Sequence, residues 1–221
     1  MKLNEMNIII TGANGSLAAV LMDYFSNRAA FVVGTVRQLS KNVDDNKNSA
    51  IIEMDPLDHH SIDGAIDWIH NEVGDIHVWL NIVGGFTMGN RVEEGRDDWA
   101  FMYNTNFMTM LNCCQKILPK MKRVGWGRLI NMGAQVAIKG LPLAGPYCTS
   151  KIAVHALTKI IALENGGDIT CNAIVPGIID TSINRNQMPE ADHENWVRPK
   201  NIAKKIEETL LSSENGSLIS V

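Results

Sequence analysis

Two side chains in the second half of the sequence are spaced for acid–base chemistry. Tyr147 and Lys151 are four residues apart in a stretch, residues 147–164, that is predicted to be helical, so both side chains lie on one face. A phenol with an ordinary pKa of about 10 is a poor acid–base catalyst at neutral pH. A neighbouring ammonium favours the phenolate and lowers that pKa. The pair therefore predicts proton transfer, although a partly exposed helix start without chemistry would carry the same residues.

A glycine-containing turn near the N-terminus is suited to phosphate. It runs from Thr11 to Ala18 and joins the first predicted strand to the first predicted helix. Gly12 and Gly15 supply positions where the backbone can take a positive φ or approach a pyrophosphate, and the N–H groups of the helix start can bind the anion. A tight turn without a ligand is the alternative, but the position between strand and helix favours a nucleotide site. The cofactor contacts expected here are Gly12, Asn14, Gly15, Ser16 and Leu17.

Polar and small residues also follow three later predicted strands. The carboxyl ends of parallel strands share one edge of a sheet, and ligands bind at that edge. Asp55 could accept a hydrogen bond from an adenine amino group, although Asp-Pro and Pro-Gly pairs are also ordinary turn sequences. Together these residues predict one cofactor crevice, and its members are Asp55, Pro56, Asn81, Gly84, Pro176, Gly177, Ile179 and Thr181.

Short apolar runs alternate with longer helical patterns, and these elements must position the candidate residues. The runs are rich in Ile and Val without polar alternation, as in parallel strands covered on both faces. Strands are predicted at residues 7–11, 30–36, 50–54, 78–82, 128–132, 170–175 and 216–221. Helices are predicted at residues 17–27, 61–71 (with Ser61 as the cap), 99–122, 147–164 and 201–212.

Repeated strand–helix units predict an α/β fold: a single-domain doubly wound parallel sheet (Rossmann fold) over residues 1–221. Residues 38–49 are predicted to form a surface loop. Residues 180–200, the longest irregular segment, follow a late strand at the edge where ligands bind. We therefore expect residues 180–200 to be the substrate loop.

The composition argues against several classes of function. The 221 residues include 20 Lys and Arg and 24 Asp and Glu, a net charge of −4 with His neutral, so no basic excess is available for nucleic acid. No apolar run approaches the ~20 residues of a membrane span, and the N-terminus lacks a signal-peptide layout. The four cysteines have no Cys-x-x-Cys spacing and the six histidines form no metal-ligand group. We expect a cytoplasmic protein without a metal, nucleic-acid or membrane partner.

The ordered set of motifs resembles the short-chain dehydrogenase/reductase family. The resemblance runs from residue 11 to residue 221 and rests on the glycine turn, Asp55, residues 81–84, Asn106, Tyr147 with Lys151, and residues 176–181. It implies hydride transfer between a nicotinamide cofactor and a carbonyl-type small molecule. It also implies that Tyr147 gives or takes the proton, that Lys151 binds the nicotinamide ribose, and that Asn106 holds a proton-relay water. A homodimer or homotetramer formed through two long helices is implied as well.

One position departs from the family pattern. Most members carry a serine thirteen residues before the tyrosine, where it polarises the substrate carbonyl, but residue 134 is alanine here. Loss of one such donor typically costs about 10²–10³ in rate. Three explanations stay open. The substrate needs no such donor, Gln135 or another group replaces it, or the protein is a catalytically weak NADP(H)-sensing protein.

The first explanation is supported by a partial resemblance to the quinonoid dihydropteridine reductase branch, which lacks the serine but keeps Tyr-x-x-x-Lys. The similar residues are those at 83–86, Gly133 with Ala134, and several between 180 and 196. A quinonoid imine is already electrophilic, so a single proton donor can suffice. A reductase of such an imine is therefore the alternative to a carbonyl reductase.

The end of the second predicted strand bears on the choice of cofactor. Folds specific for NAD usually place an acid there to bind the ribose diol. The sequence has Arg37 instead, where a 2′-phosphate could bind. NADP(H) is therefore favoured and NAD(H) stays open. NADH-preferring dihydropteridine reductases have an aspartate at this position, so Arg37 counts against the pterin alternative.

Overall fold

A computed structural model describes residues 1–39 and 48–221, so most of the surface loop predicted at residues 38–49 lies outside the described residues. The strands are β1 Asn7–Thr11, β2 Phe31–Val36, β3 Ser49–Glu53, β4 Val78–Asn81, β5 Gly127–Met132, β6 Ile169–Val175 and β7 Leu218–Ser220. They pair in parallel in the order β3-β2-β1-β4-β5-β6-β7. The reversal between β1 and β4 is the switch point of a doubly wound sheet, and the predicted fold class is confirmed.

The central strand β1 shows how the sheet separates two apolar cores. All five of its residues are buried. Ile8 and Ile10 pack in one core with Phe25, whereas Ile9 packs in the other core with Ile66. Successive side chains of a strand point to opposite faces. Both faces are therefore covered, which explains why the apolar runs lack polar alternation.

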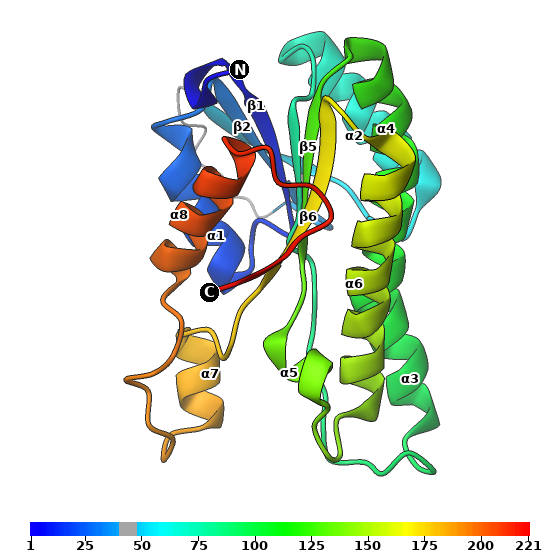
Figure 1. Cartoon of the computed structure of the whole chain (residues 1–221), viewed down its shortest axis with the longest axis vertical. Helices are drawn as coiled ribbons and strands as arrows, with labels where there is room; N and C mark the ends of the chain where they lie inside the picture. Colours follow the sequence, from blue (N-terminus) through cyan, green and yellow to red (C-terminus); the bar gives the residue numbers. More distant parts are fainter. Residues whose placement is uncertain (40–47) are drawn as a thin grey trace.

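The longer helices form a layer on each face of the sheet. Their bounds are α1 Ser16–Ser26, α2 His59–Glu72, α4 Thr109–Val124, α6 Gly145–Asn165 and α8 Pro199–Leu210. Helices α1 and α8 lie on one side of the sheet, and α2, α4 and α6 lie on the other (Figure 1). The expected strand–helix alternation therefore produces a three-layer α/β/α molecule.

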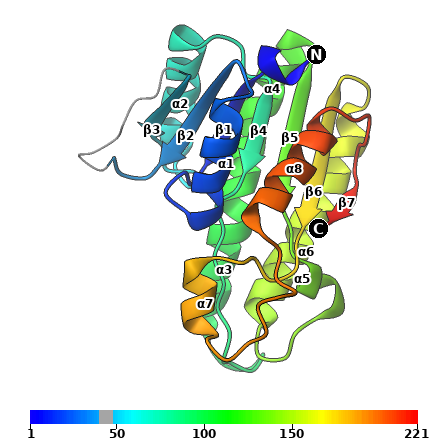
Figure 2. The same cartoon turned by 90° about the vertical axis from the view of Figure 1, so that its left-hand side faces the viewer.

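Short helices lie beyond the carboxyl ends of the strands. They are α3 Arg96–Met102, α5 Gln135–Lys139 and α7 Ser182–Gln187, whereas the 3₁₀ turn η1 Leu3–Glu5 precedes β1 at the opposite end. Figure 2 shows α5 and α7 below the sheet, with α3 beside them. This end of the molecule carries the connections that the sequence predicts to bind ligands.

The predicted helix at residues 99–122 is longer and less regular than expected. It begins at α3, passes through the π-helix η2 Tyr103–Met108, and continues as α4 to Val124. A π-helical turn inserts an extra residue into the helix and often marks a functional site. Asn106 lies inside it, so the irregular turn is the one that presents a predicted catalytic residue.

Two further predictions about local structure are wrong. Helix α2 begins at His59, with Asp58 as the cap accepting from His60 N–H, so Ser61 lies inside the helix and its Oγ instead accepts from Asp55 N–H at 2.9 Å. Residues 180–200 are also not irregular throughout, because they contain α7 and the start of α8. Thr181 makes α7 possible by capping it, with its hydroxyl accepting from Asn184 N–H at 3.2 Å.

Candidate active site

The glycine turn places open backbone donors at the switch point of the sheet. Gly12 has φ +71°, and a Cβ there would lie 3.0 Å from Val83 Cγ2, so only glycine fits without strain. Gly15 N–H donates to Gly12 O at 2.9 Å and closes the turn. Within the described chain no side chain caps the first turn of α1. The N–H groups of this turn are therefore available to an anion.

Thr11 fixes this turn against the neighbouring strand. Its buried hydroxyl accepts from Ile82 N–H at 3.0 Å and Val83 N–H at 3.3 Å, and it donates to Leu80 O at 3.3 Å. The single side chain therefore clamps the ends of β1 and β4 together. Sequence reasoning identified Thr11 only as the start of the motif, because its partners are about seventy residues away along the chain.

Tyr147 and Lys151 lie on one face of α6, as predicted. Pro146 stands at the start of this helix, where its fixed φ is compatible with the first turn. The Tyr147 ring packs edge-on against Phe86, with 4.8 Å between centroids. Lys151 is buried, and its Nζ donates to Met132 O at 2.8 Å. The helix thus carries both groups to the carboxyl ends of β4 and β5.

The segment that leads into α6 is tied to the loop after β4. Gly89 N–H donates to Leu143 O at 2.8 Å, and Asn90 bridges to Ala144. Leu143 has φ +65°, a strained conformation for a branched side chain that persists only when its surroundings hold it. This contact brings the loop carrying Phe86 next to the helix carrying Tyr147.

Burial shifts the pKa values of both groups toward their neutral forms. It raises the pKa of Tyr147 to about 12, with a smaller effect from Cys148, and lowers the pKa of Lys151 to about 8. The expectation that Lys151 lowers the pKa of the phenol is therefore wrong for this structure, because the loss of water around the phenol dominates. At neutral pH Tyr147 is a protonated phenol beside a lysine that is still mostly an ammonium.

Asn106 is drawn into the same group by its contacts. Its Oδ1 accepts from Gly85 N–H at 2.9 Å, and its Nδ2 donates to Ser150 Oγ at 3.0 Å. A Cβ on Gly84 would lie 3.0 Å from Asn106 Oδ1 and 3.2 Å from Lys151 Nζ. The structure therefore brings Gly84, Asn106 and Lys151 together, and a side chain at position 84 would disturb both polar groups.

The side chain of Asn81 does not belong to the open part of the site. It is buried, with Oδ1 accepting from Trp79 Nε1 at 3.0 Å and Nδ2 donating to Asn131 Oδ1 at 2.8 Å. Asn131 Nδ2 in turn donates to Thr158 Oγ1 at 2.9 Å. This chain of hydrogen bonds links β4 to β5 and α6. Because the side chain is fully engaged in the core, any cofactor contact predicted for Asn81 would have to come from its backbone.

The other predicted cofactor residues lie along the same edge. Arg37 is exposed directly after β2. Asp55 follows β3, where its Oδ1 accepts from Leu57 N–H at 2.9 Å, and Pro56 O accepts from Asn112 Nδ2 at 3.1 Å. Pro176, Gly177, Ile179 and Thr181 follow β6 in order. Their placement agrees with a crevice that runs across the carboxyl ends of the strands.

Ala134 lies next to the tyrosine, at the end of β5. It is buried and packs with Ala144 and Cys148 in a small apolar cluster against which Tyr147 also packs. Gln135 is the suggested replacement for the missing hydroxyl. Its side chain lies near Gly177, where an added Cβ would be 3.6 Å from Gln135 Oε1. The wall beside Tyr147 is therefore a methyl group where most of the family has a hydroxyl.

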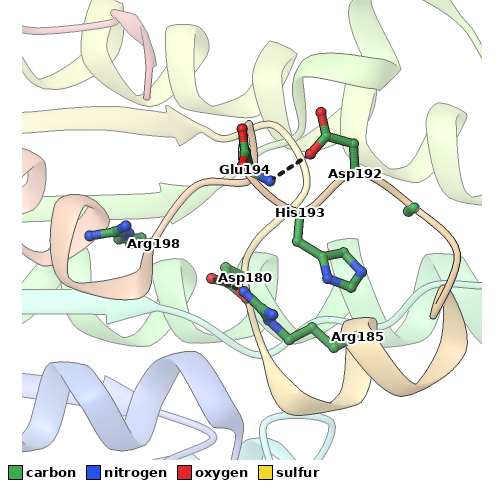
Figure 3. A pocket seen from close by; sticks show the side chains of 7 residues that line it. Asp180, Arg185, Asp192, His193, Glu194 and Arg198 are labelled. Carbon is green, nitrogen blue, oxygen red and sulfur yellow. Dashed lines mark hydrogen bonds and ion pairs between the residues drawn. The ribbon is translucent and has the colours of Figure 1, made fainter.

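Residues of the predicted substrate loop enclose a charged pocket (Figure 3). It has a volume of about 400 Å³ and is lined by Asp180, Arg185, Ala191, Asp192, His193, Glu194 and Arg198. Arg185 pairs with Asp180, with 3.0 Å between Nη2 and Oδ2. His193 packs against Trp196 with ring centroids 4.3 Å apart. The segment therefore offers charged and aromatic groups to a polar ligand.

The described residues contain neither a metal-binding cluster nor a membrane-spanning helix. Among residues 1–39 and 48–221, no three His, Cys, Asp or Glu side chains are grouped to hold a metal ion. In the same residues, no helix has the length and apolar character that crossing a membrane requires.

These features together define a class of protein: a doubly wound nucleotide-binding fold with a Tyr–Lys–Asn group at the carboxyl edge of its sheet. The sequence model of the family described as short chain dehydrogenase matches residues 6–192. The chain belongs to the short-chain dehydrogenase/reductase family and is an NAD(P)-dependent oxidoreductase.

Known relatives are moderately similar in sequence. The chain is 29% identical over 182 residues to 3-ketodihydrosphingosine reductase of Bacteroides thetaiotaomicron, covering 81% of this chain and 66% of that protein. It is 28% identical over 203 residues to the 3-oxoacyl-(acyl-carrier-protein) reductase of Pseudomonas aeruginosa, covering 88% of this chain and 81% of that protein. The chain thus spans about two thirds of the length of the first relative.

Solved structures share the fold at lower identity. ElxO with NADP bound superimposes with a TM-score of 0.88 at 24% identity, covering 100% of this chain and 97% of that one. Aldohexose dehydrogenase of Thermoplasma acidophilum gives 0.86 at 24% identity, with 99% and 93% covered. Gluconate 5-dehydrogenase of Burkholderia cenocepacia, in complex with NADP and tartrate, gives 0.85 at 22% identity, with 100% and 94% covered.

Proposed function

We propose that the protein reduces a carbonyl-type small molecule with NADPH, and that Tyr147 donates the proton. The observation that carries this proposal is that partly buried Tyr147 and buried Lys151 and Asn106 lie at the sheet edge that also holds the glycine turn. The raised pKa of Tyr147 keeps the phenol protonated at neutral pH, and the protonated phenol is the form that a reduction needs.

The residues at this edge fit a nicotinamide dinucleotide. Gly12, at φ +71° and close to Val83, shapes the turn, and no side chain of the described residues caps the first turn of α1, so its N–H groups can bind the pyrophosphate. Exposed Arg37 at the end of β2 can bind a 2′-phosphate, and NADP is bound in ElxO and in gluconate 5-dehydrogenase. These points support NADP(H) over NAD(H). Further contacts are expected from Asn14, Gly15, Ser16, Leu17, Asp55, Pro56, Gly84, Pro176, Gly177, Ile179, Thr181 and the backbone of Asn81.

The cofactor, when bound, supplies the hydride, and three side chains of this chain manage the proton. Tyr147 gives its phenolic proton to the substrate oxygen as negative charge develops there. Lys151 uses one of three N–H donors on Met132 O, which leaves two for the ribose and the phenol. Asn106, fixed by Gly85 and Ser150, is expected to hold the water that returns a proton to Lys151.

Ala134 favours a second candidate function, the reduction of a quinonoid dihydropteridine. A carbonyl oxygen gains stabilisation from a second donor during reduction, but the wall beside Tyr147 presents only a methyl group. An electrophilic imine needs one proton donor and no second hydroxyl. Arg37 at the cofactor edge argues in the other direction, so the carbonyl substrate is placed first.

One assay separates these functions. NADPH and NADH oxidation are measured with a panel of ketones and aldehydes and, beside it, quinonoid dihydropterin. The proposal expects turnover of a carbonyl with preference for NADPH. Turnover of the pterin alone would replace it with the imine reductase. Tight NADP(H) binding without turnover of any compound would instead indicate a nucleotide-sensing protein.

A further inference from the structure

A buried histidine continues the active face of α6 and has no part in the proton path described above. Tyr147, Lys151 and His155 follow one another at intervals of four residues, so their side chains lie along one helix face. The side chain of His155 is only 4% exposed. Its imidazole lies one turn beyond Lys151, under the end of β5.

His155 makes its hydrogen bond to the position where the family serine is missing. Ala134 N–H donates to His155 Nε2 at 3.2 Å. An imidazole nitrogen that accepts from an N–H carries no proton, so the ring is neutral with its proton on Nδ1. Nδ1 has no hydrogen-bond partner within the described chain. The ring is thus held by the Ala134 peptide, and its protonation state is fixed by that contact.

The His155 ring occupies the space that a side chain at residue 133 would need. A Cβ on Gly133 would overlap His155 Nε2 and lie 2.8 Å from His155 Cδ2. Gly133 N–H meanwhile donates to Ile174 O at 2.8 Å as part of the sheet. Glycine at position 133 is therefore required by the imidazole and not by a turn. The two residues form a complementary pair.

Two side chains of α6, those of Lys151 and His155, bind consecutive peptide units of the β5–α5 connection. Lys151 Nζ donates to Met132 O at 2.8 Å, and His155 accepts from Ala134 N–H. Met132 and Ala134 therefore stand at fixed distances from the helix that carries Tyr147. Misplacement by about 1 Å at a reacting centre can cost about 10²-fold in rate.

We propose that neutral His155 is a positioning residue that holds the Gly133–Ala134 wall of the active site against α6. It does so by packing against Gly133 and by accepting one hydrogen bond from Ala134 N–H. The proposal rests on the function proposed above, since the wall matters for catalysis only if Tyr147 is the proton donor. In this proposal His155 needs no contact of its own with the substrate or the cofactor. It acts through the peptide of Ala134.

The surroundings keep the ring neutral. Burial lowers the pKa of His155 from its ordinary value of 6.5, and the positive charges of Lys151 and Lys159 lower it further. Gly133, which faces the ring from the end of β5, brings no charge. A protonated ring would oppose its Nε2–H to Ala134 N–H, so the contact requires the neutral form.

The contact itself is tested by amide hydrogen exchange of Ala134 in the full-length protein. In wild type this N–H is expected to be protected. In His155→Phe, which keeps a ring but removes the acceptor, we expect exchange at least ~10-fold faster. His155→Gln, whose amide oxygen can accept, should restore protection. Equal exchange in wild type and His155→Phe would overturn the proposal.

The positioning role is tested by kinetics with a matched control. His77 also accepts a backbone N–H, from Asn7 at 3.0 Å, but it lies at the opposite end of the sheet, before β4. His155→Phe is expected to lower kcat for NADPH oxidation about 10- to 100-fold with the Kd for NADPH nearly unchanged. His155→Gln should regain most of kcat, and His77→Phe should leave kcat near wild type. Equal kcat in the two phenylalanine variants would contradict the proposal.

A double substitution covers the case in which His155→Phe does not fold. Gly133→Ala should lower the melting temperature in wild type but much less in a His155→Ala background, because the overlap is then removed. Equal losses in both backgrounds would refute the complementary pair. If wild type shows no turnover while Ala134 exchange and this coupling behave as expected, the proposed function fails and the positioning of the wall stands.

Discussion

Lys151 is buried and Tyr147 is partly buried, and this burial sets how strongly each group holds its proton. The pKa of Tyr147 is raised to about 12 and that of Lys151 is lowered to about 8. Tyr147 stays protonated and can donate its proton, and the Lys151 ammonium, which loses its proton more easily than usual, can replace it. The two side chains are therefore in the protonation states that the proposed reduction needs.

The lowered pKa of Lys151 predicts a basic limb in the pH profile. The ammonium form, which we expect to support Tyr147, is complete well below pH 8 and is lost as the pH rises through about 8. The kcat for NADPH oxidation should therefore fall above about pH 8 in wild type. In Lys151→Arg, whose guanidinium stays charged, this limb should move upward even if kcat is lower. A flat profile through pH 8 in wild type would contradict the assignment.

At the residue scale, the sequence identified the groups that share a family pattern and missed those that depend on distant contacts. Tyr147, Lys151 and Asn106 follow from motif order, and the structure places Lys151 and Asn106 beside the same glycine. The roles of Thr11 and His155 depend on backbone groups 71 and 21 residues away. No local pattern signals such pairings.

At the scale of elements, strands were easier to predict than the short helices near the site. The core strands are apolar runs whose limits follow from composition, and β1 Asn7–Thr11 agrees at both ends. Helices α5 and α7 are too short to show helical periodicity. Instead, α5 is stabilised by a tertiary contact, the hydrogen bond from Gln135 N–H to Pro176 O at 3.0 Å, and α7 by the cap of Thr181.

The hydrogen bonds of Asn81 contribute to a network that joins β4, β5 and α6. They predict that replacing Asn81 lowers the stability of the protein without changing its affinity for NADPH. Asn81→Ala removes the partners of Trp79 Nε1 and Asn131 Oδ1 in the core. The free energy of unfolding should fall by on the order of 3 kcal/mol, because buried polar groups lose their partners. Urea unfolding measures this loss, and the Kd for NADPH measured below the unfolding transition should stay near the wild-type value.

Asn27→Ala provides the matched control for this element. Asn27 is exposed at the end of α1 and bonds only locally, to Asp23 O at 3.4 Å, so its loss should change the free energy of unfolding by less than about 0.5 kcal/mol. Equal effects of the two substitutions on unfolding would contradict the core role of Asn81. A large loss of NADPH affinity in Asn81→Ala would show that its side chain serves the cofactor site.

At the scale of the whole molecule, helix α6 presents a row of exposed apolar side chains on its outer face. Ile152, Ile160 and Leu163 of α6 are 44%, 47% and 87% exposed. Apolar side chains on one outer helix face favour contact with another protein surface. A homodimer or homotetramer through the long helices remains our prediction, as does a cytoplasmic location.

This prediction is tested by one substitution on each helix layer. Leu163→Arg should shift the protein toward monomer in light scattering, because a charge would be buried in the interface. Leu211, 53% exposed at the end of α8 on the other side of the sheet, provides the control, and Leu211→Arg should leave the mass unchanged. A wild-type protein that is monomeric at all concentrations would contradict the expected assembly.

The central claim is tested most directly by removing one oxygen atom. Tyr147→Phe keeps the ring that packs against Phe86 but cannot donate a proton. We expect turnover of the best carbonyl substrate to fall by about 10²-fold or more, while calorimetry finds the Kd for NADPH close to that of wild type. Turnover in Tyr147→Phe that matches wild type would show that another group supplies the proton and would contradict the account.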